Sequence, residues 1–186
     1  MSGIVYYTKI AETYRGKNLE HMIGEKLLER ALRETYGLEL SFEPRGKGSH
    51  GKPFLTMQPK IHYNISHSGY YVMCFLAEDE VGIDVQEHKK VNYERMLKRM
   101  VPKEMIPQIL ERDDPMQAFY DQWVLREAYI KWTGEGLSRD LRTIDLNQGF
   151  SGMLQLEPGY SCAFWCSREK DISMRFVQIE LQDVLS

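Results

Sequence analysis

The sequence predicts an α+β protein of two similar lobes, each a small, mainly antiparallel sheet packed on helices. Two long amphipathic segments and many short apolar runs, separated by glycines and turn residues, predict the helices and the strands. The apolar strand after Gly69-Tyr70 recurs 90 residues later, after Gly159-Tyr160, which predicts an internal duplication. We therefore expect an N-terminal lobe at 1–88 and a C-terminal lobe at 89–186, related by a pseudo-two-fold axis, with the active site in the cleft between them.

The first half of the chain combines one long helix with several strands. Residues 4–8 are β-branched and aromatic, as in a strand. Leu19 to Tyr36 carries apolar residues three and four apart, which predicts an amphipathic helix that ends at Gly37. The other expected elements are a short strand at 38–42, a turn-rich loop at 44–53, strands at 61–65 and 70–77 joined by a turn at 66–69, and a strand at 81–85.

The second half is predicted to repeat this arrangement. A strong helix is expected from about Met116 to Thr133, ending near Gly134. The other expected elements are helical segments at 93–100 and 102–110 and strands near 143–146, 153–156, 160–166 and 173–181.

Composition excludes several classes of protein. The 186 residues suit a globular unit, and 11% aromatic residues argue against disorder. No stretch approaches the roughly 20 apolar residues of a membrane span, and no secretory signal is visible, so we expect a cytoplasmic protein without a membrane partner. A net charge of −3 gives no overall field that attracts nucleic acid. Cys74, Cys162 and Cys166 lack CxxC spacing, which predicts buried thiols rather than disulfides or a zinc site.

The segment from Pro44 to Ala77 contains no Asp or Glu, although it carries Arg45, Lys47, Lys52 and Lys60. A solvated surface normally mixes both signs of charge, so this segment indicates an anion-binding surface. A gap of this length also arises by chance.

Polar side chains on the strand at 81–85 suggest a cation site. Val81, Ile83 and Val85 alternate on one face, which places Asp84 and Gln86 together on the other. A carboxylate and an amide oxygen so placed suit a hard cation such as Mg²⁺. The alternative is a strand that runs into solvent, with Asp84 as its first polar residue.

The helix at 116–133 carries Trp123, Glu127 and Lys131 four residues apart, on one stripe. Glu127 and Lys131 suit an exposed ion pair, but the tryptophan indicates a partly buried stripe, in which a carboxylate needs a cation. Ser66 and His67, at the expected turn, suit an anion site. A Ser–His hydrolase is disfavoured because no Gly-x-Ser-x-Gly motif is present.

Together these segments resemble the 4′-phosphopantetheinyl transferases, in particular the larger surfactin-synthetase-activating type with two pseudo-symmetric lobes. The resemblance covers the chain from about Leu19 to its end. The motifs that carry it, in the order of the family, are Gly51-Lys52-Pro53, Asn64-Ile-Ser-His-Ser-Gly69, Gly82-Ile-Asp-Val85, Trp123-Val-Leu-Arg-Glu-Ala-Tyr-Ile-Lys131 and Gly134-x-Gly136-Leu137.

The resemblance implies specific roles for these residues. Lys52 of the Gly-Lys-Pro motif, Ser66 and His67 would hold the adenine end and 3′-phosphate of coenzyme A. Asp84 and Glu127 would bind Mg²⁺ (or Mn²⁺) and take part in catalysis, together with Lys131 at the pyrophosphate. The full set implied for coenzyme A is Gly51, Lys52, Pro53, Ser66, His67, Arg126 and Lys131.

The chain departs from the family pattern at several places. Gln86 stands at the third acidic metal position, where its amide oxygen can bind the metal without adding charge. Arg126 replaces a lysine, and Glu104 is a further candidate acid near the site. The N-terminal region is short and lacks much of a basic segment, for which Arg15, Lys17 and Arg45 are candidate replacements.

The resemblance implies that the chain transfers the phosphopantetheine arm of coenzyme A to a serine of an apo acyl or peptidyl carrier protein. We expect a monomer, with the acid-free segment at 45–60 facing an acidic carrier. Gln86 and the short N-terminal region motivate the alternative, a non-catalytic module of the same fold that binds coenzyme A or a carrier protein.

Overall fold

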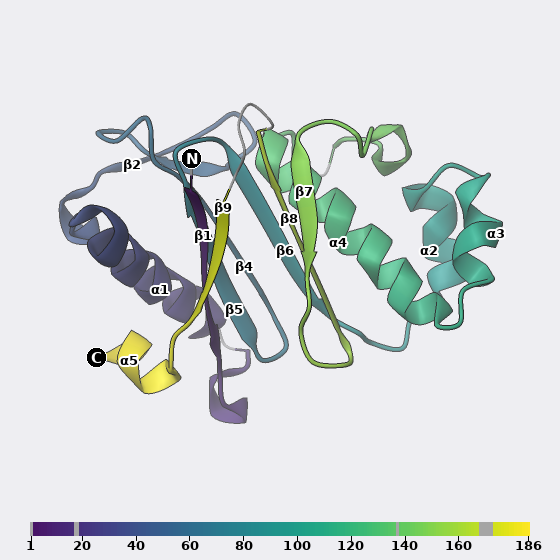
Figure 1. The fold of residues 1–186 in the computed structure, drawn as a ribbon, viewed down its shortest axis with the longest axis horizontal. Coiled ribbons are helices and arrows are strands. Elements are labelled where there is room, and N and C mark those ends of the chain that lie inside the picture. The colour runs from purple at the N-terminus through teal and green to yellow at the C-terminus, as the bar shows by residue number, and fades with distance from the viewer. Residues whose placement is uncertain (1, 17–18, 137, 168–172) are drawn as a thin grey trace.

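Two small sheets lie between two long helices, and each helix covers the outer face of one sheet (Figure 1). The computed structural model describes residues 2–16, 19–136, 138–167 and 173–186. The first sheet has the order β4 (His62–Ser68), β5 (Tyr71–Ala77), β1 (Ser2–Lys9) and β9 (Ser173–Gln178). The second has the order β6 (Val81–Glu87), β8 (Tyr160–Cys166) and β7 (Phe150–Leu154). Helices packed on small, mainly antiparallel sheets confirm the α+β expectation.

The helix α1 (Leu19–Tyr36) packs against the first sheet. Its buried side chains recur at helical spacing and join one apolar core with β1, β4 and β5. The helix ends at Gly37, which has a φ of +68° and therefore needs glycine's freedom in the left-handed region. The expected helix bounds are confirmed.

The helix α4 (Pro115–Thr133) packs against the second sheet. The Asp114 side chain accepts a hydrogen bond from the backbone N–H of Gln117 and caps the helix, and Pro115 occupies its first turn. Gly134, with a φ of +68°, ends it. The other side of α4 is covered by α2 (Tyr93–Met100), α3 (Met105–Leu110) and the 3₁₀ turn η3 (Leu141–Thr143).

The two sheets exchange strands between the halves of the chain. β6 follows the β4–β5 hairpin but pairs with β8 in the second sheet. β9 follows β8 but pairs in parallel with β1 in the first sheet, and α5 (Leu181–Leu185) then packs on α1. Each sheet therefore contains one strand from the other half of the sequence. The division into lobes at 1–88 and 89–186 stays a prediction.

A central apolar core joins the inner faces of β5 and β8. Side chains that are 89 positions apart in the sequence face each other across this core. This offset is one residue smaller than the 90 residues that separate Gly69-Tyr70 from Gly159-Tyr160. The facing pairs are Tyr71 and Tyr160, with ring centroids 4.9 Å apart, Met73 and Cys162, with sulfurs 3.3 Å apart, and Phe75 and Phe164, with centroids 5.9 Å apart.

Several short elements differ from the expectation, including β7, which lies at Phe150–Leu154 and not at 153–156. Residues 38–42 form no strand, because the N–H groups of Phe42 and Glu43 bond locally into the 3₁₀ turn η2 (Leu40–Phe42). No strand forms at 143–146, because Thr143 ends η3, which Asp140 caps, and residues 144–146 are irregular or in a turn. Within the loop at 44–53, β2 (Arg45–Lys47) pairs with β3 (Pro53–Leu55). A further 3₁₀ turn, η1 (Glu12–Tyr14), follows β1.

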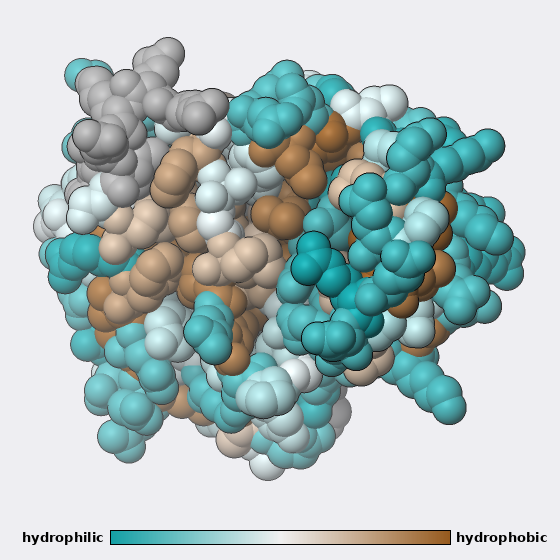
Figure 2. Space-filling model, turned by 45° about the vertical axis from the view of Figure 1, so that its right-hand side comes forward, coloured by the Kyte–Doolittle hydropathy of each residue, from teal (hydrophilic) through white to brown (hydrophobic). Residues whose placement is uncertain are grey.

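The outer edges of the two sheets carry apolar side chains at the surface. Phe150 and Met153 on β7 and Phe176 on β9 are among the exposed large hydrophobic residues, and Figure 2 shows apolar side chains gathered on part of the molecular surface. These edges lie at the opposite ends of the sheets from β4 and β6. Among the described residues, no helix combines the length and the apolar character needed to cross a membrane.

Candidate active site

Side chains, rather than a backbone ladder, join the two sheets where β4 runs beside β6. Every second side chain of β4 accepts a hydrogen bond from a backbone N–H of β6, and the residue numbers differ by 19 at each step, as expected for parallel strands. We call these three hydrogen bonds the seam. They run from the N–H of Ile83 to Asn64 Oδ1 (2.9 Å), from that of Val85 to Ser66 Oγ (3.2 Å) and from that of Glu87 to Ser68 Oγ (3.0 Å).

The alternation of β6 turns its polar residues toward α4. At Gly82 a side chain would collide with the backbone of Ala128 and Trp132, so the strand approaches the helix there more closely than any other residue permits. Asp84 and Gln86 leave the strand on the same face as Gly82. The expected alternation is confirmed, since Val81, Ile83 and Val85 lie in the central core.

Asp84 is buried and is held by two donors on one of its oxygens. Lys131 Nζ lies 2.6 Å from Asp84 Oδ1, and Ser66 Oγ donates to the same oxygen at 3.1 Å. Lys131 also donates to Ser66 Oγ at 2.9 Å. Asp84 Oδ2 is buried and has no hydrogen-bond partner among the described residues. A buried carboxylate oxygen without a partner is costly, so this atom indicates a ligand position.

Glu127 lies one helical turn before Lys131 and is half-buried. Burial raises the pKa of its carboxyl group, and the negative charge of Asp84 raises it further, while Lys131 opposes the shift. Lys131 is paired with Asp84, and the described residues show no ion pair between Glu127 and Lys131. Glu127 and Lys131 therefore belong to a polar cluster with β6 and do not form an exposed ion pair on the helix.

The oxygen atoms in this cluster fit a hard divalent cation. The free Oδ2 of Asp84 and the Glu127 carboxylate are oxygen ligands of the kind that Mg²⁺ prefers, and Gln86 lies two residues along the same strand face. In the part of the chain that the structure describes, no three His, Cys, Asp or Glu side chains gather at one point.

Lys52 ties the Gly-Lys-Pro loop to both sheet and helix. Its ammonium group contacts the Glu80 carboxylate and donates to the carbonyls of Val81 (3.0 Å) and Trp132 (2.9 Å). Burial lowers the pKa of Lys52, against the effect of Glu80. A cavity of about 330 Å³ opens beside this loop, lined by Gly51, Lys52 and Pro53 and by Asn64, Glu127 and Lys131.

Ser66 and His67 lie within β4 and not in a turn, because the strand continues to Ser68 and the chain reverses at Gly69-Tyr70. Their side chains therefore leave opposite faces of the strand. Ser66 is buried in the Asp84 cluster, whereas His67 is exposed on the side of α1. Although the residue as a whole is exposed, partial burial of its imidazole is the main cause that lowers the pKa of His67, while Glu20 opposes the shift. The expectation that the two residues converge as in a turn was wrong.

Arg126 faces away from Asp84. Only 1% of its surface is exposed, and its guanidinium donates to the carbonyl (3.3 Å) and side chain (2.6 Å) of Gln122, with Met105 Sδ at 3.9 Å. Burial lowers its pKa to about 10, and no described carboxylate pairs with it. Its contact with coenzyme A stays a prediction.

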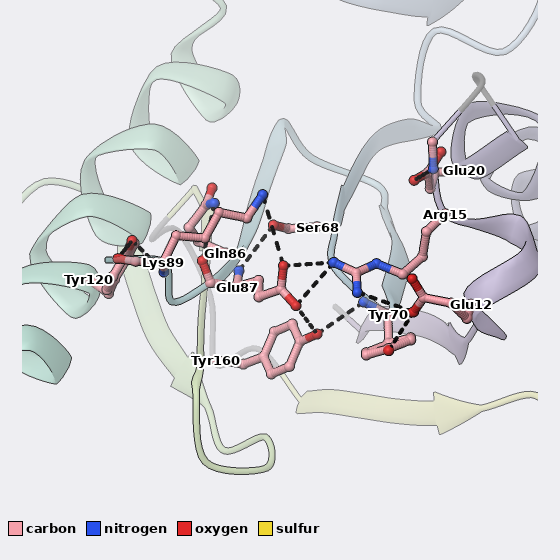
Figure 3. Close-up of polar contacts among 11 residues, drawn as sticks. Glu12, Arg15, Glu20, Ser68, Tyr70, Gln86, Glu87, Lys89, Tyr120 and Tyr160 are labelled. Atoms are coloured by element: carbon pink, nitrogen blue, oxygen red, sulfur yellow. Dashed lines mark hydrogen bonds and ion pairs between the residues drawn. The ribbon is translucent and has the colours of Figure 1, made fainter. Parts of the chain in front are cut away.

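Figure 3 shows how Glu87 is engaged on the other side of β6 from Gln86. Arg15 donates to both Glu87 oxygens, at 3.2 and 2.9 Å, and its guanidinium lies 4.5 Å from the centre of the Tyr70 ring. Tyr160 donates to the same carboxylate at 3.3 Å. Glu87 thus provides no substitute for the carboxylate that Gln86 lacks.

The other residues singled out in the sequence are engaged, lie elsewhere or fall outside the described residues. Arg45 pairs with Glu25 at 2.6 Å. Glu104 is exposed just before α3. Lys17, and Leu137 of the last motif, lie outside the described residues.

Sequence reasoning missed Asn64 and Ser68 as partners of β6 and Glu80 as the partner of Lys52. Short polar side chains at every second position of the strand were the available signal for the seam. No sequence pattern marks Glu80, because it pairs with residues 18 and 28 positions away.

Comparison with known proteins identifies the family. The family model described as the 4′-phosphopantetheinyl transferase superfamily matches residues 80–183, more than half of the chain. The chain belongs to this superfamily. Its match to these transferases includes β6, α4 and the second sheet, and thus Asp84, Glu127 and Lys131.

Individual relatives agree with this assignment. The chain is 30% identical to a 4′-phosphopantetheinyl transferase of Bacillus subtilis over 137 residues, which cover 73% of this chain and 61% of the relative. It is 27% identical to the transferase named Sfp of Bacillus subtilis (strain 168) over 182 residues, or 88% and 80% of the two chains. With the transferase psf-1 of Bacillus pumilus it shares 31% identity over 141 residues, or 73% and 58%. The chain thus spans about three fifths of the first and third relatives. All three names are those of transferases, which favours an enzyme over a non-catalytic module.

Proposed function

We propose that this chain transfers the 4′-phosphopantetheine arm of coenzyme A to a serine hydroxyl of an apo acyl or peptidyl carrier protein and releases 3′,5′-ADP. The observation that carries the proposal is the buried Oδ2 of Asp84, which has no hydrogen-bond partner among the described residues. The same carboxylate is paired with Lys131, and its charge raises the pKa of Glu127. Glu127 and Lys131 line the cavity that also borders the Gly-Lys-Pro loop. Membership of the transferase superfamily supports the same reaction.

The proposed reaction forms a bond between the serine oxygen and the β-phosphorus of coenzyme A and breaks the bond from that phosphorus to the bridging oxygen of 3′,5′-ADP. Glu127 accepts the hydroxyl proton, directly or through a water. Lys131 stabilises the negative charge on the departing phosphate. Its ammonium group is held in place by Asp84 and Ser66.

A divalent cation would be held by Asp84 Oδ2, Glu127 and the amide oxygen of Gln86. When bound, Mg²⁺, or Mn²⁺ in its place, would neutralise the pyrophosphate and stabilise the leaving group. One chain supplies every residue named here, which supports action as a monomer. Action in the cytoplasm stays a prediction.

Intact-mass spectrometry of an apo carrier protein tests the proposal. Incubation with this protein, coenzyme A and Mg²⁺ should add one phosphopantetheine arm to the carrier, and EDTA should prevent the addition. Glu127→Gln should slow the transfer by about 10²- to 10⁴-fold, because the variant keeps the shape of the side chain but cannot take a proton. Glu111→Gln, at an exposed position after α3, is the matched control and should transfer at the normal rate.

Two results would contradict the proposal. One is coenzyme A binding that is indifferent to metal, with no transfer to fatty-acid, polyketide or peptide-synthetase carriers. The other is an unchanged transfer rate in Glu127→Gln, which would remove Glu127 from the proton transfer.

A further inference from the structure

A buried hydroxyl, that of Ser161, joins the end of β6 to the first turns of α4. Ser161 is the cross-strand neighbour of Gln86, and only 2% of it is exposed. Its Oγ lies 2.6 Å from Asp121 Oδ1, 2.9 Å from Gln117 Nε2 and 2.9 Å from His88 Nε2. Gln117 Nε2 also donates to the Asp121 carboxylate, at 2.8 Å. We call this hydrogen-bonded group, formed by Ser161, Asp121, Gln117 and His88, the Ser161 cluster.

The chemistry of these groups fixes which nitrogen of His88 carries the proton. A carboxylate can only accept hydrogen bonds, and an amide nitrogen can only donate them. Ser161 therefore gives its one proton to Asp121 and accepts from Gln117. Because that proton is used, a lone pair on His88 Nε2 would face a lone pair of the hydroxyl at 2.9 Å, so Nε2 must be the donor. In the neutral imidazole the other nitrogen, Nδ1, then carries a lone pair and can only accept.

The lone pair of Nδ1 is held in a fixed direction. The His88 ring lies flat against Tyr120, with ring centroids 4.3 Å apart and 5° between the planes. The backbone N–H of His88 donates to the carbonyl of Gly159 at 2.8 Å. Nδ1 has no hydrogen-bond partner among the described residues, and it is not one of the buried atoms that lack a partner. An acceptor that is rigidly oriented, unused and open to solvent suits a donor on a bound partner.

The place of His88 relative to the proposed reaction identifies that partner. Asp84, Gln86 and His88 follow one another at every second position, on the side of β6 that meets α4. Lys131, at the departing phosphate, contacts Asp84 at one end of this row, and the cavity beside the Gly-Lys-Pro loop opens there. The attacking and leaving oxygens of a phosphoryl transfer lie roughly in line. The serine of the carrier therefore approaches from the other end of the row, where His88 lies.

We propose that His88 Nδ1 accepts a hydrogen bond from the carrier segment that presents the serine, and that the Ser161 cluster orients the ring for this contact. The inference rests on the proposed function for the identity of the partner. Strand geometry places His88 about 7 Å beyond Gln86. Its partner is therefore a donor beside the serine on the carrier and not the hydroxyl that attacks. His88 is thus a positioning residue.

Two substitutions separate the two nitrogens of His88. Asparagine places its amide oxygen where Nδ1 lies but does not reach Ser161, whereas glutamine places its amide nitrogen where Nε2 lies and offers no acceptor at Nδ1. Both remove the ring from Tyr120, so each variant is the control for the other. His88→Gln should raise the KM for the carrier about 3- to 10-fold, the effect of one lost hydrogen bond. His88→Asn should stay within about 2-fold of wild type, because its amide oxygen accepts in place of Nδ1.

The other constants of the reaction distinguish positioning from a structural defect. In both variants kcat, the KM for coenzyme A and the affinity for Mn²⁺ without a carrier should be unchanged, since only carrier binding is lost. The assays are made at pH 8, above the ordinary pKa of histidine of about 6.5, so that the neutral ring predominates. Equal losses in both variants, no loss in either, or a loss confined to His88→Asn would overturn the inference.

Nitrogen-15 NMR of wild type tests the same contact without a variant of this chain. At pH 8 the His88 signals should show a proton on Nε2 and none on Nδ1. Saturation with an apo carrier whose acceptor serine is replaced by alanine, which prevents transfer, should shift the Nδ1 signal and leave that of Nε2 in place. A protonated Nδ1 in the free protein, or no shift on saturation, would contradict the proposal even if the variants fail to fold.

The failure of this inference differs from failure of the proposed function. If wild type transfers the arm but His88→Gln keeps a normal KM for the carrier, the role of His88 is wrong and the enzyme stands. If wild type transfers no arm to any carrier, the proposed function is wrong and the partner of Nδ1 falls with it. The NMR signals of the free protein still test the proton positions in the Ser161 cluster.

Discussion

One carboxylate, Glu80, contacts the Gly-Lys-Pro loop beside the cavity. His62 Nδ1 lies 3.2 Å from one of its oxygens, and Lys52 contacts the other. The hydrogen bond to His62 is the main cause that lowers the pKa of Glu80 to about 2, and Lys52 adds to the shift while burial opposes it. The ionised form of Glu80 therefore helps to hold the loop that borders the site, together with the hydrogen bonds from Lys52 to the carbonyls of Val81 and Trp132.

This dependence predicts how acid affects stability. The pKa of Glu80 falls from an ordinary 4.5 to about 2 on folding, so its contribution is complete above about pH 4.5 and is lost as the pH falls toward 2. Half of the side chain is exposed, so solvent screening keeps the contribution small. Urea midpoints of wild type and Glu80→Gln should therefore differ most at neutral pH and converge between pH 4.5 and 2.

The control for this measurement is Glu78→Gln, at a neighbouring exposed position without an ion pair among the described residues. Its midpoints should run parallel to those of wild type. A constant difference between wild type and Glu80→Gln across the acid range would contradict the assigned role of Glu80.

At the scale of elements, the contact between β6 and α4 determines the geometry of the site. Asp84 comes from the strand and Lys131 from the helix, and their side chains meet at 2.6 Å where the two backbones lie close together. Gly82 permits this approach, since any side chain there would meet the backbone of Ala128 and Trp132. Backbone atoms cannot move aside as a flexible side chain can.

Gly82→Ala should therefore destabilise the protein and disturb the site together. We expect a loss of about 1 to 3 kcal/mol in the free energy of unfolding, measured with denaturant, because the new methyl group forces the strand from the helix. Transfer to a carrier should also slow. Gly48→Ala is the control, since its methyl group would meet only the Lys52 carbonyl at 3.6 Å, an ordinary contact. Similar losses for both variants would contradict this explanation.

Local sequence pattern predicted the elements that hold the site. The alternation of β6, the stripe of α4 and its end at Gly134 follow from residues that are close in sequence, and β8 was predicted to the residue at 160–166. The strands predicted at 38–42 and 143–146 were wrong, because a short segment forms a strand only where a partner strand lies beside it. The contact of Lys131 with Asp84 and Ser66 joins residues 47 and 65 positions apart, so helix spacing could suggest only Glu127 as its partner.

At the scale of the whole molecule, exchanged strands make the two halves depend on each other. β6 completes the second sheet and β9 completes the first, while β5 and β8 share the central core. Which strand pairs with which is decided by the complete fold, and no local pattern in the sequence indicated the exchange. The halves are similar in order of elements but do not form separate sheets.

We predict that residues 1–88 and 89–186, produced separately, do not fold. The first fragment would lack β9 beside β1, and the second would lack β6 beside β8, so each would expose a long apolar strand edge. Circular dichroism and two-dimensional NMR of each fragment should show little structure, and mixing the fragments should restore it. The intact chain should unfold in one transition. A folded spectrum from either fragment alone would contradict the dependence of the two halves on each other.

The seam has a consequence for how this protein can change. Backbone hydrogen bonds within a sheet are nearly independent of residue type, so substitution rarely alters them one at a time. The bonds between β4 and β6 come instead from three separately encoded side chains, Asn64, Ser66 and Ser68. A single substitution can therefore lengthen, weaken or remove each hydrogen bond of the seam separately. The spacing of the two sheets around the site can thus change in small steps during evolution.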